Sequence, residues 1–291
     1  EMGGIVKALE AGYPQAQVAE VLAKRFKALE MRSDRAVGVN MYPNMTEEPL
    51  ERREEDTPKL KKEREAAVAA YVADIDTNYL AGKLAAVETV EGTIEAFSNG
   101  ATIGQVAAAS CKAEAPETVE AIAAHHWTER YEALRFETED YVKKTGKNVE
   151  VFLCNMGPIP QHKARADFST SFLQVGEFNV HLNNGFQDDE GKPGSRYEKC
   201  VEALKAGIDE NGTPYDVAVI CSTDATYPED VPALAPMIKA ANPNITLFLA
   251  GAAPKDLEPV YKEAGVDDFI SVKANCFQTL KMLQKKKGMI E

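Results

Sequence analysis

The sequence predicts an α/β protein whose C-terminal half forms a doubly wound parallel sheet. From Val149 onward, short apolar runs typical of strands alternate about five times with amphipathic runs typical of helices. Such alternation predicts a parallel sheet with helices on both faces. Short breaks with glycine, such as residues 263–265, separate the runs and suit helix C-caps. The first apolar run is followed by a loop expected over residues 158–166. In open α/β sheets, the loops after the strands form the ligand crevice.

The C-terminal elements follow from this periodicity. Strands are expected near residues 149–154, 178–181, 217–221, 246–250 and 268–271. Helices are expected near residues 162–175, 196–207, 231–241, 257–264 and 276–287. The polar, turn-rich run 186–196 is expected to be an exposed loop.

The N-terminal half is predicted to be mostly helical. Helices are expected over residues 1–11, 14–31, 58–76, 77–87, 89–98, 102–110 and 116–144. The small apolar run 36–40 suits a buried parallel strand. Residues 41–60 combine prolines with a run of charges and are expected to be a linker. Because the chain begins at Glu1 in a run that already has helical character, we expect a piece of a longer protein.

Composition excludes several partner classes. The formal net charge is −13 over 291 residues, which argues against binding to nucleic acid or to an anionic membrane. No apolar run approaches the roughly 20 residues of a membrane span, and no stretch has the basic start and apolar core expected of a secretory signal, so we expect none. The five cysteines are widely spaced and have no zinc-site spacing. We therefore expect a reducing compartment, and the cytoplasm is the simplest choice.

The sequence predicts no catalytic residue and no metal site. His125 and His126 are adjacent, and adjacent helical side chains point about 100° apart, so they do not converge on one ion. Cys154 and Cys221 lie in predicted buried strands with no base beside them, which favours core packing. His162, in the loop after the first strand, is the remaining candidate ligand.

The order of motifs resembles the methylmalonyl-CoA mutase family over nearly the whole chain. The stretches GGIVKALEAGYP and AVGVNMYPN resemble the end of that family's barrel and the start of its linker. The resemblance implies the tail of a truncated TIM barrel at 1–40, a wrap-around linker at 41–60 and a helical connector at 61–146. It implies a flavodoxin-like homologue of the cobalamin domain at 147–291.

Departures from the family's cobalamin motifs indicate which member the chain resembles. The family's D-x-H-x-x-G motif provides a histidine that ligates cobalt and an aspartate that orients it. Here Pro160 stands two residues before His162, and Arg165 stands three residues after it. We expect that a proline cannot orient the imidazole and that Arg165, with Gln161 and Lys163, could fill the crevice.

Two further motifs are also degenerate. The family's Ser-x-Leu reads Ser222-Thr223-Asp224, and its Gly-Gly reads Ala250-Gly251-Ala252. His162, Ser222 and Gly251 are therefore the candidate residues of a degenerate cobalamin pocket. The run NMGPIPQHKARADFSTSFLQVGEF resembles the small, non-catalytic subunit of heterodimeric bacterial mutases.

The resemblance implies part of the small subunit of an adenosylcobalamin-dependent isomerase of propionate metabolism. That complex interconverts methylmalonyl-CoA and succinyl-CoA, with adenosylcobalamin bound by the large subunit and none by this chain. The expected partner is the large catalytic subunit, in a heterodimer. Two alternatives stay open: a functional cobalamin-binding domain that uses His162, and a non-enzymatic adaptor that uses the crevice for another ligand.

Overall fold

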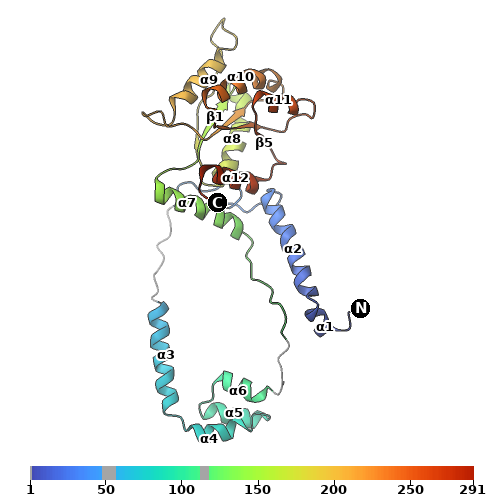
Figure 1. The fold of residues 1–291 in the computed structure, drawn as a ribbon, viewed down its shortest axis with the longest axis vertical. Coiled ribbons are helices and arrows are strands. Elements are labelled where there is room, and N and C mark those ends of the chain that lie inside the picture. Colours follow the sequence, from blue (N-terminus) through green and yellow to red (C-terminus); the bar gives the residue numbers. More distant parts are fainter. Residues whose placement is uncertain (1, 48–56, 112–117) are drawn as a thin grey trace. The chain divides into compact units, whose positions relative to one another are not determined.

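The computed structural model describes residues 2–47, 57–111 and 118–291 (Figure 1). The chain divides into two compact units, one made of residues 1–47 with 121–291 and the other of residues 48–120. None of the described helices is long and apolar enough to cross a membrane.

The larger unit is built on a five-stranded, all-parallel sheet with strand order β2-β1-β3-β4-β5. The strands are β1 (Glu150–Asn155), β2 (Asn179–His181), β3 (Val217–Cys221), β4 (Thr246–Ala250) and β5 (Asp268–Ile270). The register pairs Val151 with Val217, and Val217 with Thr246. This strand order is the flavodoxin-like one, and it confirms the predicted α/β fold class.

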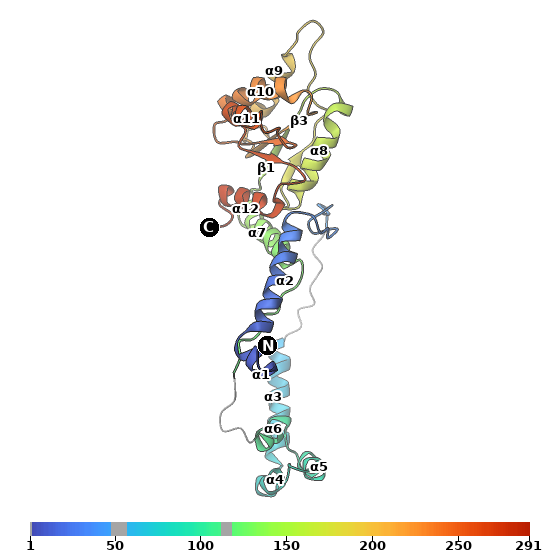
Figure 2. The ribbon, with the colours of Figure 1, turned by 90° about the vertical axis from the view of Figure 1, so that its right-hand side faces the viewer.

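Helices cover both faces of the sheet, as Figure 2 shows for α8 on one side and α9, α10 and α11 on the other. Their bounds are α8 (Ile159–Gln174), α9 (Ser195–Ala206), α10 (Tyr227–Ala241), α11 (Glu258–Ala264) and α12 (Cys276–Lys287). Side chains alternate between the faces along each strand, so Leu153 packs with α8 and α12, while Ile220 packs with α9 and α10. The sheet thus lies between two buried apolar cores, and a site is expected at the carboxyl ends of its strands.

Three further helices belong to this unit: α1 (Ile5–Glu10), α2 (Tyr13–Glu30) and α7 (Glu129–Thr145). Tyr131 of α7 is buried and stacks edge-on against Phe277 of α12, with ring centroids 5.4 Å apart. Gln284 of α12 donates to the carbonyl of Leu134 (2.6 Å) and to the hydroxyl of Thr138 (2.9 Å). These contacts fix α7 on the core beneath α12.

The smaller unit contains α3 (Thr57–Ala73), α4 (Thr77–Leu84), α5 (Val90–Ser98) and α6 (Ile103–Ser110). Asp76, Thr89 and Thr102 cap α4, α5 and α6 through side-chain bonds to backbone N–H groups. A Cβ on Gly92 would lie 1.9 Å from the carbonyl oxygen of Ala86, so only glycine permits this close approach. The buried core of the described part of this unit is small and centres on Val87, Ala96 and Val106.

Three sequence predictions about local structure were wrong. Residues 36–40 form a turn rather than a strand, because the Asn40 side chain bonds the backbone of Ala36, Leu29 and Asp34. The long helix expected over 116–144 begins only at Glu129, and residues 118–126 are not helical. The loop after β1 is shorter than expected, since α8 begins at Ile159 with Pro160 in its first turn.

Candidate functional site

The crevice predicted from the sequence lies at the carboxyl ends of the strands, beside the N-terminal half of α8. The loops after β1, β3, β4 and β5 meet there, as expected for a doubly wound sheet. His162, Ser222 and Gly251 come from α8 and from the residues that follow β3 and β4. The structure thus places all three candidate residues at this edge of the sheet.

His162 lies in the first turn of α8, and its side chain is enclosed rather than open to the crevice. It is only 3% exposed. Its Nδ1 atom lies 3.0 Å from the carbonyl oxygen of Gly157. The backbone of Gly185 lies directly against the ring, because a Cβ on Gly185 would be 2.4 Å from the His162 Cε1 atom. The imidazole is therefore held between the loop after β1 and the segment that follows β2.

This geometry differs from the expectation that Pro160 leaves the His162 imidazole without a group that orients it. A carbonyl oxygen only accepts, so Nδ1 of His162 carries the proton and donates to Gly157. A backbone carbonyl is one of the usual groups that orient a metal-binding histidine. The imidazole is thus oriented although Pro160 occupies the aspartate position, and the ring is buried.

Ser222 is fully buried, and its hydrogen bonds are used within the fold. Its hydroxyl donates to the carbonyl oxygen of Met156 (3.3 Å) and accepts from the Thr226 hydroxyl (2.8 Å). The hydroxyl of Tyr227 accepts from the Ser222 N–H (3.1 Å) and lies 2.5 Å from the carbonyl oxygen of Ala250. Burial raises the pKa of Tyr227, so this phenol stays protonated. The network ties together the ends of β1, β3 and β4.

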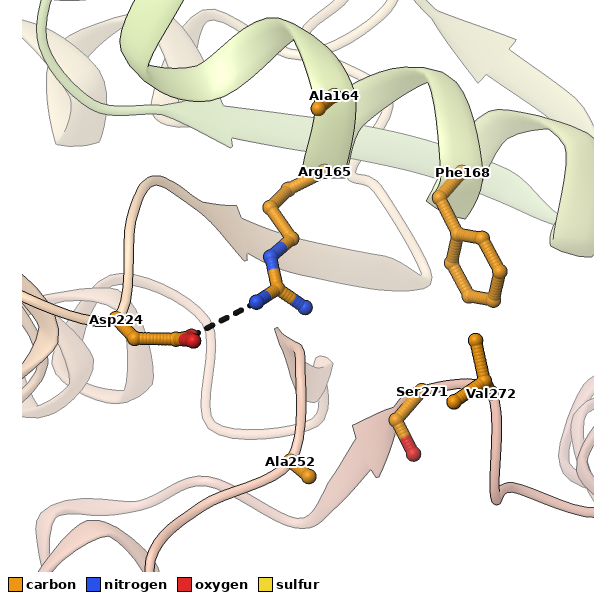
Figure 3. Close-up of a pocket in the computed structure, with 7 residues that line it drawn as sticks. All are labelled: Ala164, Arg165, Phe168, Asp224, Ala252, Ser271 and Val272. Atoms are coloured by element: carbon orange, nitrogen blue, oxygen red, sulfur yellow. Dashed lines mark hydrogen bonds and ion pairs between the residues drawn. The ribbon is translucent and has the colours of Figure 1, made fainter.

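Gly251 is covered by Arg165, which reaches across the crevice from α8. A Cβ on Gly251 would lie 2.9 Å from the Nη1 atom of Arg165. The other terminal nitrogen, Nη2, donates to Asp224 at 2.8 Å. Figure 3 shows the guanidinium between Asp224 on one side and Phe168 and Val272 on the other. Arg165 therefore occupies part of the crevice, as expected from its position three residues after His162.

A hollow of about 350 Å³ remains around this guanidinium. Its lining comes from α8 and from the loops after β3, β4 and β5, namely Ala164, Arg165, Phe168, Asp224, Ala252, Ser271 and Val272. Sequence reasoning missed Phe168 and Val272 as site residues. Only their positions in the sequence could have indicated this role: Phe168 follows Arg165 by three residues on α8, and Val272 lies in the loop after β5.

The other candidate clusters have structural roles. Among the described residues, no group of three His, Cys, Asp or Glu side chains could hold a metal ion. His125 instead bonds Glu129 (2.8 Å), and His126 bonds Glu132 (2.9 Å). Cys154 and Cys221 are fully buried, and burial raises the pKa of both thiols, which fits core packing.

Comparison with known proteins gives consistent matches. The family model described as methylmalonyl-CoA mutase matches residues 1–115. The methylmalonyl-CoA mutase small subunit of Porphyromonas gingivalis is 30% identical over 159 residues, which cover 55% of this chain and 22% of that protein. The methylmalonyl-CoA mutase of Cereibacter sphaeroides is 24% identical over 285 residues, which cover 91% of this chain and 38% of that protein.

A large subunit also matches. The methylmalonyl-CoA mutase large subunit of Propionibacterium freudenreichii subsp. shermanii is 22% identical over 290 residues, which cover 92% of this chain and 38% of that protein. The chain therefore spans only part of these relatives. Its match covers 22% of the length of the Porphyromonas gingivalis small subunit and 38% of the length of each of the other two proteins. The matches confirm the resemblance seen in the sequence: this chain is related to the methylmalonyl-CoA mutases, and small subunits are among its relatives.

Proposed function

We propose that this chain is part of the small, non-catalytic subunit of an adenosylcobalamin-dependent methylmalonyl-CoA mutase, and that it stabilises the complex without binding cobalamin. When bound, adenosylcobalamin supplies the radical chemistry that interconverts methylmalonyl-CoA and succinyl-CoA. In this proposal the large subunit holds the cofactor, and this chain contributes no catalytic residue. A cytoplasmic location belongs to the same proposal and rests on the cysteine pattern of the sequence.

The enclosure of His162 is the observation that supports the proposal most strongly. A metal–imidazole bond is about 2 Å long, so the ligating nitrogen must meet the metal at an open surface. A corrin is far wider than an imidazole, and the His162 side chain is 3% exposed with the Gly185 backbone against its ring. The residues present therefore do not fit a cobalt-ligating role, although the ring is oriented by Gly157.

The other two positions of the degenerate pocket are also occupied by the protein itself. The Ser222 hydroxyl is engaged with Met156 and Thr226, and Gly251 lies under the guanidinium of Arg165. A ligand that needed these positions would have to break several contacts of the fold. The similarity of the sequence to small subunits, at 28–30% identity, supports the same assignment.

The subunit role can be tested by mixing the full chain with the large subunit from the same organism. We expect sedimentation velocity to show a one-to-one complex, formed equally well by His162→Ala, because the buried imidazole has no part in cofactor binding. Failure of the two proteins to associate would contradict the proposal. So would a complex that forms only after this chain has been loaded with cobalamin.

A further inference from the structure

The hollow around Arg165 has the composition of a small-molecule site. Its volume of about 350 Å³ lies within the range of ligand pockets, which are mostly apolar with a few polar groups that fix orientation. Here Phe168 and Val272 provide the apolar wall, while Arg165, Asp224 and Ser271 provide the polar groups. In Figure 3 the guanidinium points into the space that these side chains surround.

The ion pair inside the hollow is loosely held. The Arg165 side chain is 34% exposed and that of Asp224 is 68% exposed. Pairs as exposed as this one change an equilibrium constant by about fivefold at most. Both side chains can therefore adjust to a ligand at small cost. The bond to Asp224 uses Nη2, and Nη1 lies next to Gly251.

The charges of the hollow select the class of ligand. One guanidinium and one carboxylate lie side by side, so their charges sum to zero. An anionic ligand would be attracted by Arg165 but repelled by Asp224. A cationic ligand would be attracted by Asp224 but repelled by Arg165. An uncharged ligand with an acceptor next to a donor can bond to both groups at once, which is the arrangement of an amide.

We propose that this hollow binds a small, uncharged, amide-bearing ring. The amide carbonyl accepts from the guanidinium of Arg165, the amide N–H donates to the carboxylate of Asp224, and the ring packs against Phe168 and Val272. The proposal goes beyond the small-subunit role and does not depend on it, since none of these contacts involves cobalamin or a partner chain.

Three probes of one shape and different charge test the proposal: benzamide, benzoate and benzamidine. Saturation-transfer NMR on the full chain should detect benzamide with a dissociation constant on the order of 1 mM, as expected for so small a ligand. Benzoate and benzamidine should each bind about tenfold more weakly. Equal binding of the three probes, or no binding of benzamide, would overturn the proposal.

Two substitutions that each remove one charge should reverse this preference. Asp224→Asn leaves Arg165 unpaired, so benzoate should become the preferred probe. Arg165→Gln leaves Asp224 unpaired, so benzamidine should become preferred. Lys163→Gln is the matched control, because Lys163 lies on the same helix but pairs with Asp167 at the surface (2.9 Å). A preference that stays unchanged in both variants, or that changes equally in the control, would place the binding elsewhere and contradict the proposal.

Discussion

The two units of this chain differ in how they bury their apolar residues. In the sheet unit, both faces of the sheet carry a buried core, and strand residues such as Leu153, Ile220 and Leu249 are at most 1% exposed. In the described part of the helical unit, Tyr71, Ile94 and Ile103 are 59–79% exposed, with their own helices well formed. Caps and a small core of Val87, Ala96 and Val106 therefore hold α4, α5 and α6, whereas two extensive cores stabilise the sheet unit.

The first prediction contrasts a buried and an exposed aliphatic residue. Leu153→Ala should lower the free energy of unfolding of the sheet unit by about 2–5 kcal/mol, because it leaves a cavity between β1 and its covering helices. Ile103→Ala should change stability by about 0.5 kcal/mol or less, because Ile103 is 79% exposed. Denaturant titrations followed by circular dichroism measure both values. A large loss in Ile103→Ala would show that α6 packs more tightly than the comparison implies.

The second prediction concerns the polar link between α9 and α10. Asp230 is 1% exposed and accepts from the Tyr197 hydroxyl (2.9 Å) and from Arg196 (3.0 Å). Asp230→Ala should cost about 2–4 kcal/mol, since it removes the buried acceptor of the Tyr197 hydroxyl and one carboxylate partner of Arg196, which keeps its ion pair with Asp188 (2.8 Å). Tyr197→Phe should cost only about 1 kcal/mol, because the ion pair survives. If the two variants lost equal stability in thermal unfolding, the ion pair would not be the principal link.

The contact between Tyr197 and Asp230 also predicts how stability changes at alkaline pH. Burial and the bond to Asp230 raise the pKa of Tyr197 to about 12. A raised folded pKa stabilises the fold below the unfolded value near 10, and this contribution is lost as pH rises through about 12. Absorbance at 295 nm should show equal numbers of tyrosines ionising near pH 10 in the native chain and in Tyr197→Phe, and the variant should lack only a step near pH 12. An ordinary titration of Tyr197 would contradict this account of the link.

The smallest expected effect is at the start of α7. The bond to Glu132 raises the pKa of His126, while bonds to His125 and Thr128 lower the pKa of Glu129 and Glu132, respectively. The contribution of His126 to stability is fully present below about pH 6.5 and is lost as the pH rises through its raised pKa. The contributions of Glu129 and Glu132 to stability are present above about pH 4.5 and are lost as the pH falls through their lowered pKa values. Amide protection factors at residues 126–128, which are corrected for the intrinsic rise of exchange with pH, should therefore be highest between these limits, and His126→Gln should remove the loss of protection on the alkaline side.

The sheet was predictable because its strands are continuous apolar runs, and β3, β4 and α12 begin and end at the predicted residues. The errors arose where side chains bond the backbone locally. Asn40 holds residues 36–40 in a turn, and the Glu129 carboxylate accepts from the His126 N–H just before α7 begins. Such bonds leave no periodicity in the sequence, so a pattern of apolar residues extends the predicted element too far.

The candidate site was predictable only in part. The positions of His162, Ser222 and Gly251 at the strand ends followed from the resemblance and the fold class. The enclosure of His162 did not, because it depends on Gly185, which approaches the imidazole from a segment 23 residues further along the chain. The bond from Arg165 to Asp224 likewise joins α8 to the loop after β3 and has no local signal.

The most direct test of the central claim is a titration of the full chain with adenosylcobalamin, followed by absorbance and calorimetry, with His162→Ala as the control. We predict that neither protein binds the cofactor, because the His162 ring is enclosed, the Ser222 hydroxyl is engaged within the fold and Arg165 covers Gly251. Tight binding by the natural chain that disappears in His162→Ala would contradict the account and identify a working cobalamin domain.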